Sequence, residues 1–159
     1  MTQLALTAEL VEYMEGGVSL LVGSRNAELR PACARAFGVE IEAASGTATL
    51  FLPAAGAQLT LSNLRENGLI ALTFSRPIDH RSLQVKGRVV SITEANERQQ
   101  RVQERYFSLF CEGLRYSGMR ESLLRRIRYS PSWAVCFRIE SMFDQTPGPG
   151  AGRVAKEAF

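Results

Sequence analysis

The residues best suited to chemistry lie on one alternating stretch in the second half of the chain. From Ser82 onward, apolar and polar side chains alternate, so a β-strand would place them on opposite faces. The apolar face would carry Leu83, Val85, Gly87 and Val89. The polar face would carry a row of hydrogen-bond donors, Ser82, Gln84, Lys86 and Arg88. Such a row either holds a polar ligand or forms the solvent-facing side of an antiparallel sheet, and the pattern leaves both interpretations open.

A second candidate is Arg35, which lies between the apolar residues Cys33 and Phe37. An unpaired guanidinium in apolar surroundings is costly, so we expect Arg35 to have an anionic partner. That partner is either a nearby glutamate, Glu40 or Glu42, or the phosphate of a ligand. The net charge of +3 comes almost wholly from arginine. This bias suits bidentate binding of carboxylate or phosphate, although a general preference for arginine explains it equally well.

Metal and nucleophile chemistry find little support in the sequence. The cysteines are odd in number, widely spaced and set among apolar residues, which predicts buried thiols at Cys33, Cys111 and Cys136. The sole histidine, His80, has no Cys-x-x-Cys pair or carboxylate cluster near it, so we predict no zinc or iron site. A triad of His80 with Asp79 or Asp144 would need a serine on a strand-to-helix elbow, and the sequence has no such signal.

Length and composition indicate the kind of protein that carries these candidate residues. A chain of 159 residues with ordinary apolar and charged fractions predicts one globular domain. No apolar run approaches the 18 residues of a membrane span, and acids occupy the N-terminal region where a secretory peptide would be basic. We therefore expect a cytoplasmic protein that does not enter a membrane.

The hydrophobic periodicity predicts strands and helices in a fixed order. A short helix capped by Thr7 precedes a hairpin of strands at 18–24 and 29–41, the second interrupted by Gly38. A strand at 47–52, a helix at 57–67 and an apolar strand at 69–74, expected to be covered on both faces, come next. The strand at 82–92, helices at 94–113 and 119–127, and a sixth strand at 133–139 that would close a barrel complete the series. The fold class is mainly β with α, with six antiparallel strands and peripheral helices.

The predicted helix at 119–127 raises a nucleic-acid hypothesis. We expect Met119, Leu123 and Ile127 to pack inward, which leaves outward a basic cluster of Arg120, Arg125, Arg126 and Arg128. A solvated helix face paired with Glu112 or Glu121 explains the same residues. Because no recognisable nucleic-acid module accompanies the cluster, nucleic-acid binding is the disfavoured alternative.

The order of elements and several local stretches resemble the FMN-binding split-barrel superfamily typified by pyridoxamine 5′-phosphate oxidase. The resemblance covers about residues 7–143 and rests on Arg30-Pro31 with Arg35-Ala36-Phe37-Gly38, on Leu50-Phe51-Leu52-Pro53 through Asn63-Leu64, and on His80-Arg81-Ser82-Leu83-Gln84-Val85-Lys86-Gly87. It implies a six-stranded split β-barrel at 1–145, followed by a Gly/Pro-rich tail at 146–159. It further implies a homodimer with FMN at the subunit interface.

The resemblance also implies a set of cofactor contacts. One subunit would supply Arg35, Gln58 and Thr60, and the other Arg81, Ser82 and Gln84. These side chains suit a phosphate monoester and the polar edges of a flavin. The resemblance thus implies an FMN-dependent oxidoreductase or flavin reductase, with no catalytic residue assigned and no substrate named.

Two departures from the family motivate an alternative. Where the oxidases have Ser-Arg-Lys at the start of the helix, this chain has Gln58-Leu59-Thr60, so two cations are missing. The substrate-binding Arg-x-His of the family is absent, because His80 is the sole histidine, and this disfavours vitamin B6 oxidation. The alternative is a non-catalytic split-barrel protein that binds another small ligand after loss of flavin affinity.

Overall fold

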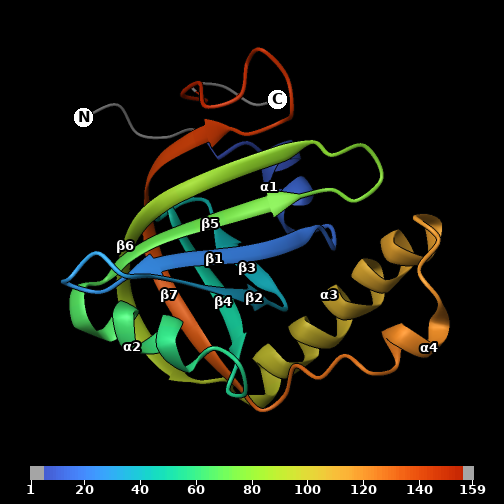
Figure 1. The fold of residues 1–159 in the computed structure, drawn as a ribbon, viewed down its shortest axis with the longest axis horizontal. Coiled ribbons are helices and arrows are strands. Elements are labelled where there is room, and N and C mark those ends of the chain that lie inside the picture. Colours follow the sequence, from blue (N-terminus) through green and yellow to red (C-terminus); the bar gives the residue numbers. More distant parts are fainter. Residues whose placement is uncertain (1–5, 156–159) are drawn as a thin grey trace.

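The computed structural model describes residues 6–155, and within them seven antiparallel strands form one sheet with four helices around it (Figure 1). The strands are β1 (Ser19–Arg25), β2 (Pro31–Ala36), β3 (Val39–Glu42), β4 (Thr47–Pro53), β5 (Leu69–Ser75), β6 (Ser82–Glu94) and β7 (Ser132–Asp144). The helices are α1 (Ala8–Glu15), α2 (Gln58–Asn67), α3 (Glu97–Tyr116) and α4 (Glu121–Leu124). The strand order is β2-β1-β5-β6-β7-β4-β3. The predicted mainly β class with peripheral helices is confirmed.

The strand count differs from the predicted six because the strand expected at 29–41 breaks in two. β2 pairs with β1 and β3 pairs with β4, so the two edge strands of the sheet are consecutive in the chain. They meet at Phe37 and Gly38, where the Phe37 N–H donates to the Phe51 carbonyl at 2.9 Å. The Phe51 N–H donates in turn to the Gly38 carbonyl at 3.0 Å. Gly38 has φ +117°, a conformation that L side chains rarely adopt.

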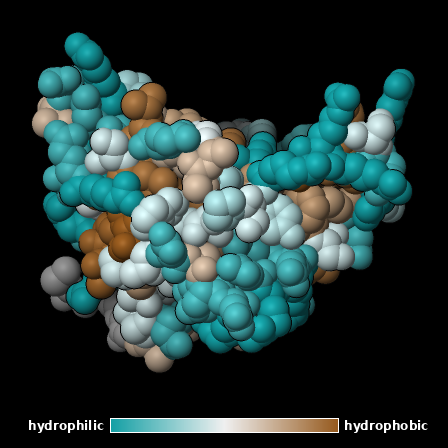
Figure 2. Space-filling model, turned by 90° about the horizontal axis from the view of Figure 1, so that it is seen from below, coloured by the Kyte–Doolittle hydropathy of each residue, from teal (hydrophilic) through white to brown (hydrophobic). Residues whose placement is uncertain are grey.

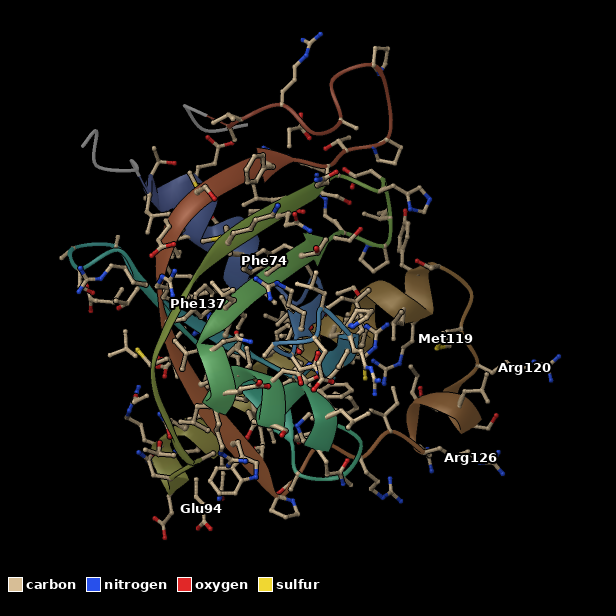
Figure 3. The ribbon with its side chains drawn as sticks, turned by 60° about the vertical axis from the view of Figure 1, so that its left-hand side comes forward. Phe74, Glu94, Met119, Arg120, Arg126 and Phe137 are labelled. Atoms are coloured by element: carbon tan, nitrogen blue, oxygen red, sulfur yellow. The ribbon has the colours of Figure 1, made fainter. Side chains whose placement is uncertain are left out.

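Alternation along the strands builds one hydrophobic core. Phe74 and Phe137, on strands far apart in the sequence, are fully buried inside the curved sheet (Figure 3). α1 adds Leu10 and Met14 to this core, and α2 adds Leu61. Complete burial of one such large apolar side chain stabilises the fold by about 1.5–3 kcal/mol.

The start of α1 and the end of α2 follow the predicted signals, whereas α3 begins and ends later than the predicted 94–113. The Thr7 hydroxyl accepts a hydrogen bond from the Leu10 N–H at 3.3 Å and caps α1. Gly68, with φ +69°, ends α2 in the left-handed conformation. At α3, Asn96 and Gln99 form a reciprocal capping box.

The predicted helix at 119–127 is wrong in length and in its buried face. Only Glu121–Leu124 is helical, and Leu124 is the buried side chain. Met119 and Leu123, expected inside, are 40% and 49% exposed, and Ile127 is half-buried. A single helical turn cannot maintain the i, i+4, i+8 face from which the prediction was made.

The buried stripe of α3 also differs from the prediction in part. Tyr106 and Phe110 are buried as expected, whereas Val102 and Leu109 are half-buried. Gln103 is fully buried instead. Its amide donates to the Phe37 carbonyl at 3.2 Å and its Oε1 accepts from the Ser132 hydroxyl at 2.7 Å, so both ends of the amide are satisfied.

The Gly/Pro-rich segment that follows β7 folds back on it. The Gly152 N–H donates to the Asp144 carbonyl at 2.7 Å, and the Ala155 N–H donates to the Met142 carbonyl at 3.0 Å. Val154 forms a bridge with Phe143. Within residues 6–155, no helix is long and apolar enough to cross a bilayer.

Candidate functional site

The outer face of four neighbouring strands, β2, β1, β5 and β6, carries a continuous cross-strand row. The register pairs Arg35 with Leu21, Leu21 with Thr73, and Thr73 with Gln84. These side chains are exposed or half-buried, whereas their neighbours along each strand are buried in the core. With strands about 4.8 Å apart, the row extends on the order of 14 Å.

The predicted alternation of β6 is confirmed from Leu83 to Arg88, whereas Ser82, expected on the polar face, is buried and Val89, expected on the apolar face, is half-buried. Leu83, Val85 and Gly87 are buried, and the opposite face runs from half-buried Gln84 to exposed Lys86 and Arg88. β5 was expected to be covered on both faces. Instead it alternates between buried and half-buried positions, so one of its faces is open.

Arg35 lies at the β2 end of the row and is exposed, contrary to the expected apolar setting. Strand alternation explains the difference, because Ala34 and Ala36 take the buried face and leave Arg35 on the other. Neither predicted glutamate is its partner. Glu40 pairs with Arg98 at 2.6 Å, while Arg35 Nη1 donates to the Ser19 hydroxyl at 2.8 Å.

The same alternation corrects the prediction of three buried thiols. Cys33 is exposed on the face that carries Arg35, Cys136 is half-buried, and Cys111 alone of the three is buried. Apolar sequence neighbours predict burial poorly in a strand, because adjacent residues point to opposite faces.

A hollow of about 670 Å³ lies on the outer face at the pair Gly23 and Ala71, which are two residues away from Leu21 on β1 and from Thr73 on β5. Its floor includes the small residues Gly23 and Ala71, and its rim includes Arg25, Lys86 and Glu140. A Cβ added at Gly23 would meet Ala71 atoms at 3.9 and 4.0 Å, an ordinary contact distance. The backbone at Gly23 therefore has room for a Cβ on the floor of the hollow.

Ser82 lies at the start of β6, and its polar groups serve the β5–β6 turn. It is buried, and its hydroxyl donates to the His80 carbonyl at 2.8 Å. The Ser75 hydroxyl lies 2.7 Å from the Ser82 hydroxyl. Because the Ser82 hydrogen is used toward His80, Ser75 is the donor in this second contact. The Ser82 N–H donates to the Thr146 hydroxyl at 3.1 Å. Ser82 therefore ties the turn to the C-terminal segment.

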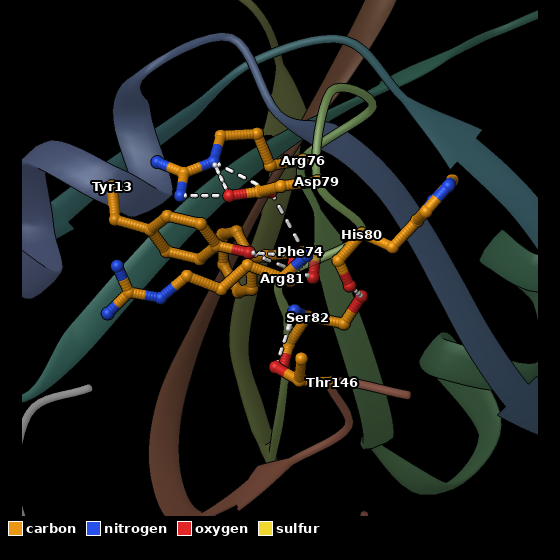
Figure 4. Close-up of polar contacts among 8 residues, drawn as sticks. All are labelled: Tyr13, Phe74, Arg76, Asp79, His80, Arg81, Ser82 and Thr146. Carbon is orange, nitrogen blue, oxygen red and sulfur yellow. Dashed lines mark hydrogen bonds and ion pairs between the residues drawn. The ribbon is translucent and has the colours of Figure 1, made fainter. Parts of the chain in front are cut away.

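Arg81 belongs to a cluster with α1 rather than to the row (Figure 4). The Tyr13 ring lies between two guanidinium groups, with Arg76 5.7 Å and Arg81 5.2 Å from its centroid. Burial raises the pKa of the Tyr13 phenol to about 12. Hydrogen bonds from the Arg76 guanidinium and the Arg81 backbone N–H lower the pKa of the Asp79 carboxyl to about 2.

Gln58 and Thr60 lie in the first turn of α2. Gln58 is exposed and its Oε1 accepts from the Gly56 N–H at 3.0 Å, while Thr60 is buried. α2 is fixed to β1 by Asn63, whose amide donates to the Ser24 hydroxyl at 3.2 Å. Within the described residues, no hydrogen bond joins Gln58 or Thr60 to the row.

The structure thus groups the six predicted cofactor contacts in three places. Arg35 and Gln84 share the row, with Ser82 at its margin, while the other three lie on α2 or against α1. The residues that the sequence did not reveal are Leu21, Gly23 and Thr73, which become part of the site through strand pairing.

The basic segment follows the end of α3. Glu121 pairs with Arg115 at 2.8 Å and with Arg125 at 3.7 Å, as the solvated-helix interpretation predicted for this glutamate. Arg120 and Arg126 point outward (Figure 3). Seen from below, long hydrophilic side chains project beside apolar surface on the side occupied by α3 and α4 (Figure 2). No group of three potential metal ligands occurs among residues 6–155.

Comparison with solved structures shows which class of proteins shares this fold. The sheet and its helices have the fold of pyridoxamine 5′-phosphate oxidase-like and FMN-binding proteins, and the predicted resemblance is confirmed at the level of fold. Comparisons with protein-family models and with curated protein sequences find no match.

Three solved structures illustrate the similarity. A Clostridium acetobutylicum protein related to general stress protein 26 of B. subtilis, of the pyridoxinephosphate oxidase family, is 18% identical with a TM-score of 0.54, covering 93% of this chain and 92% of that chain. An F420 reductase is 13% identical with a TM-score of 0.55, covering 82% and 93%. An FMN-binding protein from Syntrophomonas wolfei is 13% identical with a TM-score of 0.52, covering 84% of each.

Proposed function

We propose that this protein is an FMN-binding oxidoreductase related to the pyridoxamine 5′-phosphate oxidase-like proteins. The observation that carries the proposal is the open outer face, where the row from Arg35 to Gln84 adjoins the hollow at Gly23. The fold is shared with an FMN-binding protein and an F420 reductase, which favours a flavin or deazaflavin over other ligands.

The residues of the outer face fit a flavin. A flat apolar ring system needs a floor of small side chains, and Gly23 and Ala71 provide one. A phosphate needs charge-assisted donors, and Arg25 and Lys86 stand at the rim. Gln84 would orient a polar ring edge with its Oε1 and one amide N–H, since Nε2 already donates to the Thr73 hydroxyl at 3.1 Å. The bound flavin would supply the hydride or electron transfer, while these residues bind and orient it.

The proposal includes a homodimer built on a split barrel. Phe37 and Gly38, which join the edge strands β2 and β3, both hydrogen-bond to Phe51 of β4, which supports a barrel rather than an open sheet. Gln58, Thr60 and Arg81 lie away from the row within one chain. For all six predicted residues to contact one cofactor, a second copy would have to contribute.

The visible spectrum of the purified protein tests the proposal. We expect flavin absorbance near 450 nm as purified or stoichiometric quenching of flavin fluorescence on titration with FMN, on the order of one flavin per chain. F420 is titrated in parallel, and light scattering reports the molar mass. A colourless protein that quenches neither compound would reject the flavin proposal.

The second candidate is a non-catalytic protein of the same fold that binds another small ligand. It is favoured by Gln58, which stands near the start of α2 in place of a cation and uses its Oε1 to accept the Gly56 N–H. This candidate predicts ligand-dependent thermal stabilisation without FMN binding. Tight FMN binding would remove the reason for it.

A further inference from the structure

A second pocket, separate from the hollow at Gly23, lies between the sheet and the α3–α4 region. Its volume is about 460 Å³, within the range of sites for small molecules. β1, β2 and the β5–β6 turn form one side, and α3 with the segment after it forms the other. Its lining is Ser19, Leu21, Arg35, Phe37, Ser75, Pro77, Phe110, Leu114, Met119 and Ile127.

Arg35 is the single charged residue of this lining. The guanidinium lies 5.7 Å from the centroid of the Phe110 ring, and Nη1 donates to the Ser19 hydroxyl. These two contacts hold the planar group in place. No carboxylate pairs with Arg35 among the described residues, although a guanidinium carries five N–H donors.

The rest of the lining is mostly apolar. Phe37 and Phe110 belong to the buried core, and Leu114 and Ile127 are half-buried beside it. Met119, which is 40% exposed, contributes a flexible side chain suited to varied ligand shapes. The pocket thus offers one oriented cation beside a wall that would bury apolar surface.

We infer that this pocket binds a small apolar carboxylate, with the carboxylate held by Arg35 and the apolar part packed between Phe110 and Leu114. A carboxylate matches the fork of a guanidinium in shape and charge. A neutral ligand would lose that bond, and a cation would be repelled. The pocket shares Arg35 and Leu21 with the row of the proposed flavin face, but no residue that lines it also lines the hollow at Gly23.

The test uses phenylacetate as the probe, with phenylacetamide and phenethylamine as the neutral and cationic analogues. Binding to the full chain without added flavin is measured by ligand-observed NMR and calorimetry. We expect phenylacetate to bind about tenfold more tightly than phenylacetamide, as one charge-assisted hydrogen-bonding contact predicts. Equal affinity for the three probes, or no binding of phenylacetate, would overturn the inference.

Two variants locate the probe. Arg35→Gln is expected to reduce phenylacetate affinity about tenfold and to leave phenylacetamide unchanged. Leu114→Trp, which fills the pocket from α3, is expected to abolish binding of both. Arg30→Gln is the matched control, because Arg30 is an exposed arginine beside β2 that does not line the pocket. Circular dichroism confirms that each variant is folded, and phenylacetate affinity unaffected by both pocket variants would contradict the assignment.

FMN titration separates this inference from the proposed function. Because the hollow at Gly23 and this pocket have no lining residue in common, phenylacetate and an FMN held in the hollow are expected to bind together. Carboxylate binding in a protein that does not quench FMN would reject the flavin proposal and retain the pocket. Displacement of phenylacetate by stoichiometric FMN would overturn the separate pocket and retain the flavin.

Discussion

The phenol of Tyr13 donates a hydrogen bond to the backbone carbonyl of Arg81, 68 positions later in the chain, at 2.7 Å. The contact fixes α1 to the turn that joins β5 and β6. Arg81 directly precedes β6, which carries Gln84. The contact therefore also helps to position the start of this strand and, with it, the outer face.

Tyr13→Phe is expected to lower the free energy of unfolding by about 0.5–1.5 kcal/mol, the net contribution of one hydrogen bond. The loss should stay modest because the Arg81 carbonyl also accepts the Arg76 N–H at 2.9 Å. Thermal melting measures the change, and about 2–4 °C is expected per kcal/mol for a chain of this length. Tyr116→Phe, at a side chain that is 80% exposed, should leave the melting temperature unchanged.

Asp79 should make the stability depend on acid pH. Its carboxyl has a pKa of about 2 in the folded protein against 3.8 ordinarily, because Arg76 and the Arg81 N–H donate to the charged form. The unfolded state therefore binds the proton more readily as pH falls. The stabilisation is present above about pH 4 and lost as pH falls towards 2.

The measurement is the melting temperature of wild type and Asp79→Asn from pH 6 to pH 2. The difference between the two should be largest above about pH 4 and disappear near pH 2. Since both side chains of the pair are solvent-accessible, high salt should reduce it. The control is Glu112→Gln, at an exposed glutamate on α3. Its melting temperature should change with pH in the same way as that of wild type.

Gly38→Ala tests the junction between β2 and β3. An added Cβ would lie 2.9 Å from a ring carbon of Phe51 and 3.4 Å from Cγ of Gln103. Gly56→Ala is the matched control, because Gly56 also has positive φ, at +88°, but nothing lies within 4 Å of its Cβ position. We expect Gly38→Ala to cost about 1–3 kcal/mol more than Gly56→Ala in chemical denaturation, from overpacking alone. Equal losses of unfolding free energy in the two variants would show that Phe51 and Gln103 can shift to accommodate the added Cβ.

Gly23→Val tests the hollow on the outer face. The new side chain occupies the proposed ring position, so FMN affinity should fall at least about tenfold, a loss of about 1.4 kcal/mol. Stability should change by no more than about 0.5 kcal/mol, since the added Cβ meets only ordinary contact distances and valine suits a strand. Ser91→Val, at an exposed strand position outside the hollow, should leave affinity unchanged. Undiminished FMN binding by Gly23→Val would place the flavin elsewhere.

Periodicity predicted most elements because each depends on short-range pattern and capping. Thr7 and Gly68 mark helix ends in the sequence and in the structure alike. The interruption at Gly38 was predicted, but the pairing of its two sides with different strands was not, because it depends on hydrogen bonds to Phe51, which belongs to another strand. Gln103 is buried because Ser132 and the Phe37 carbonyl satisfy it, and neither partner is near it in the sequence.

The candidate site was predictable along one strand and not across strands. The alternation around Gln84 requires only the sequence of β6. The neighbours Thr73 and Leu21 follow from the order β1-β5-β6, in which strands distant in the chain become adjacent. Gln58 and Arg81 were predicted from the family resemblance, and the separation of these two from the row depends on the packing of α2 and α1.

The return of the chain onto β7 covers part of the edge of this strand. β4 covers one edge of β7 only as far as Arg138, and the later residues pair with β6 on the other edge. The backbone groups of Met142 and Asp144 instead bond to Ala155, Gly152 and Arg153. An uncovered strand edge is a template for pairing with another chain, so we expect this segment to disfavour aggregation by covering the edge.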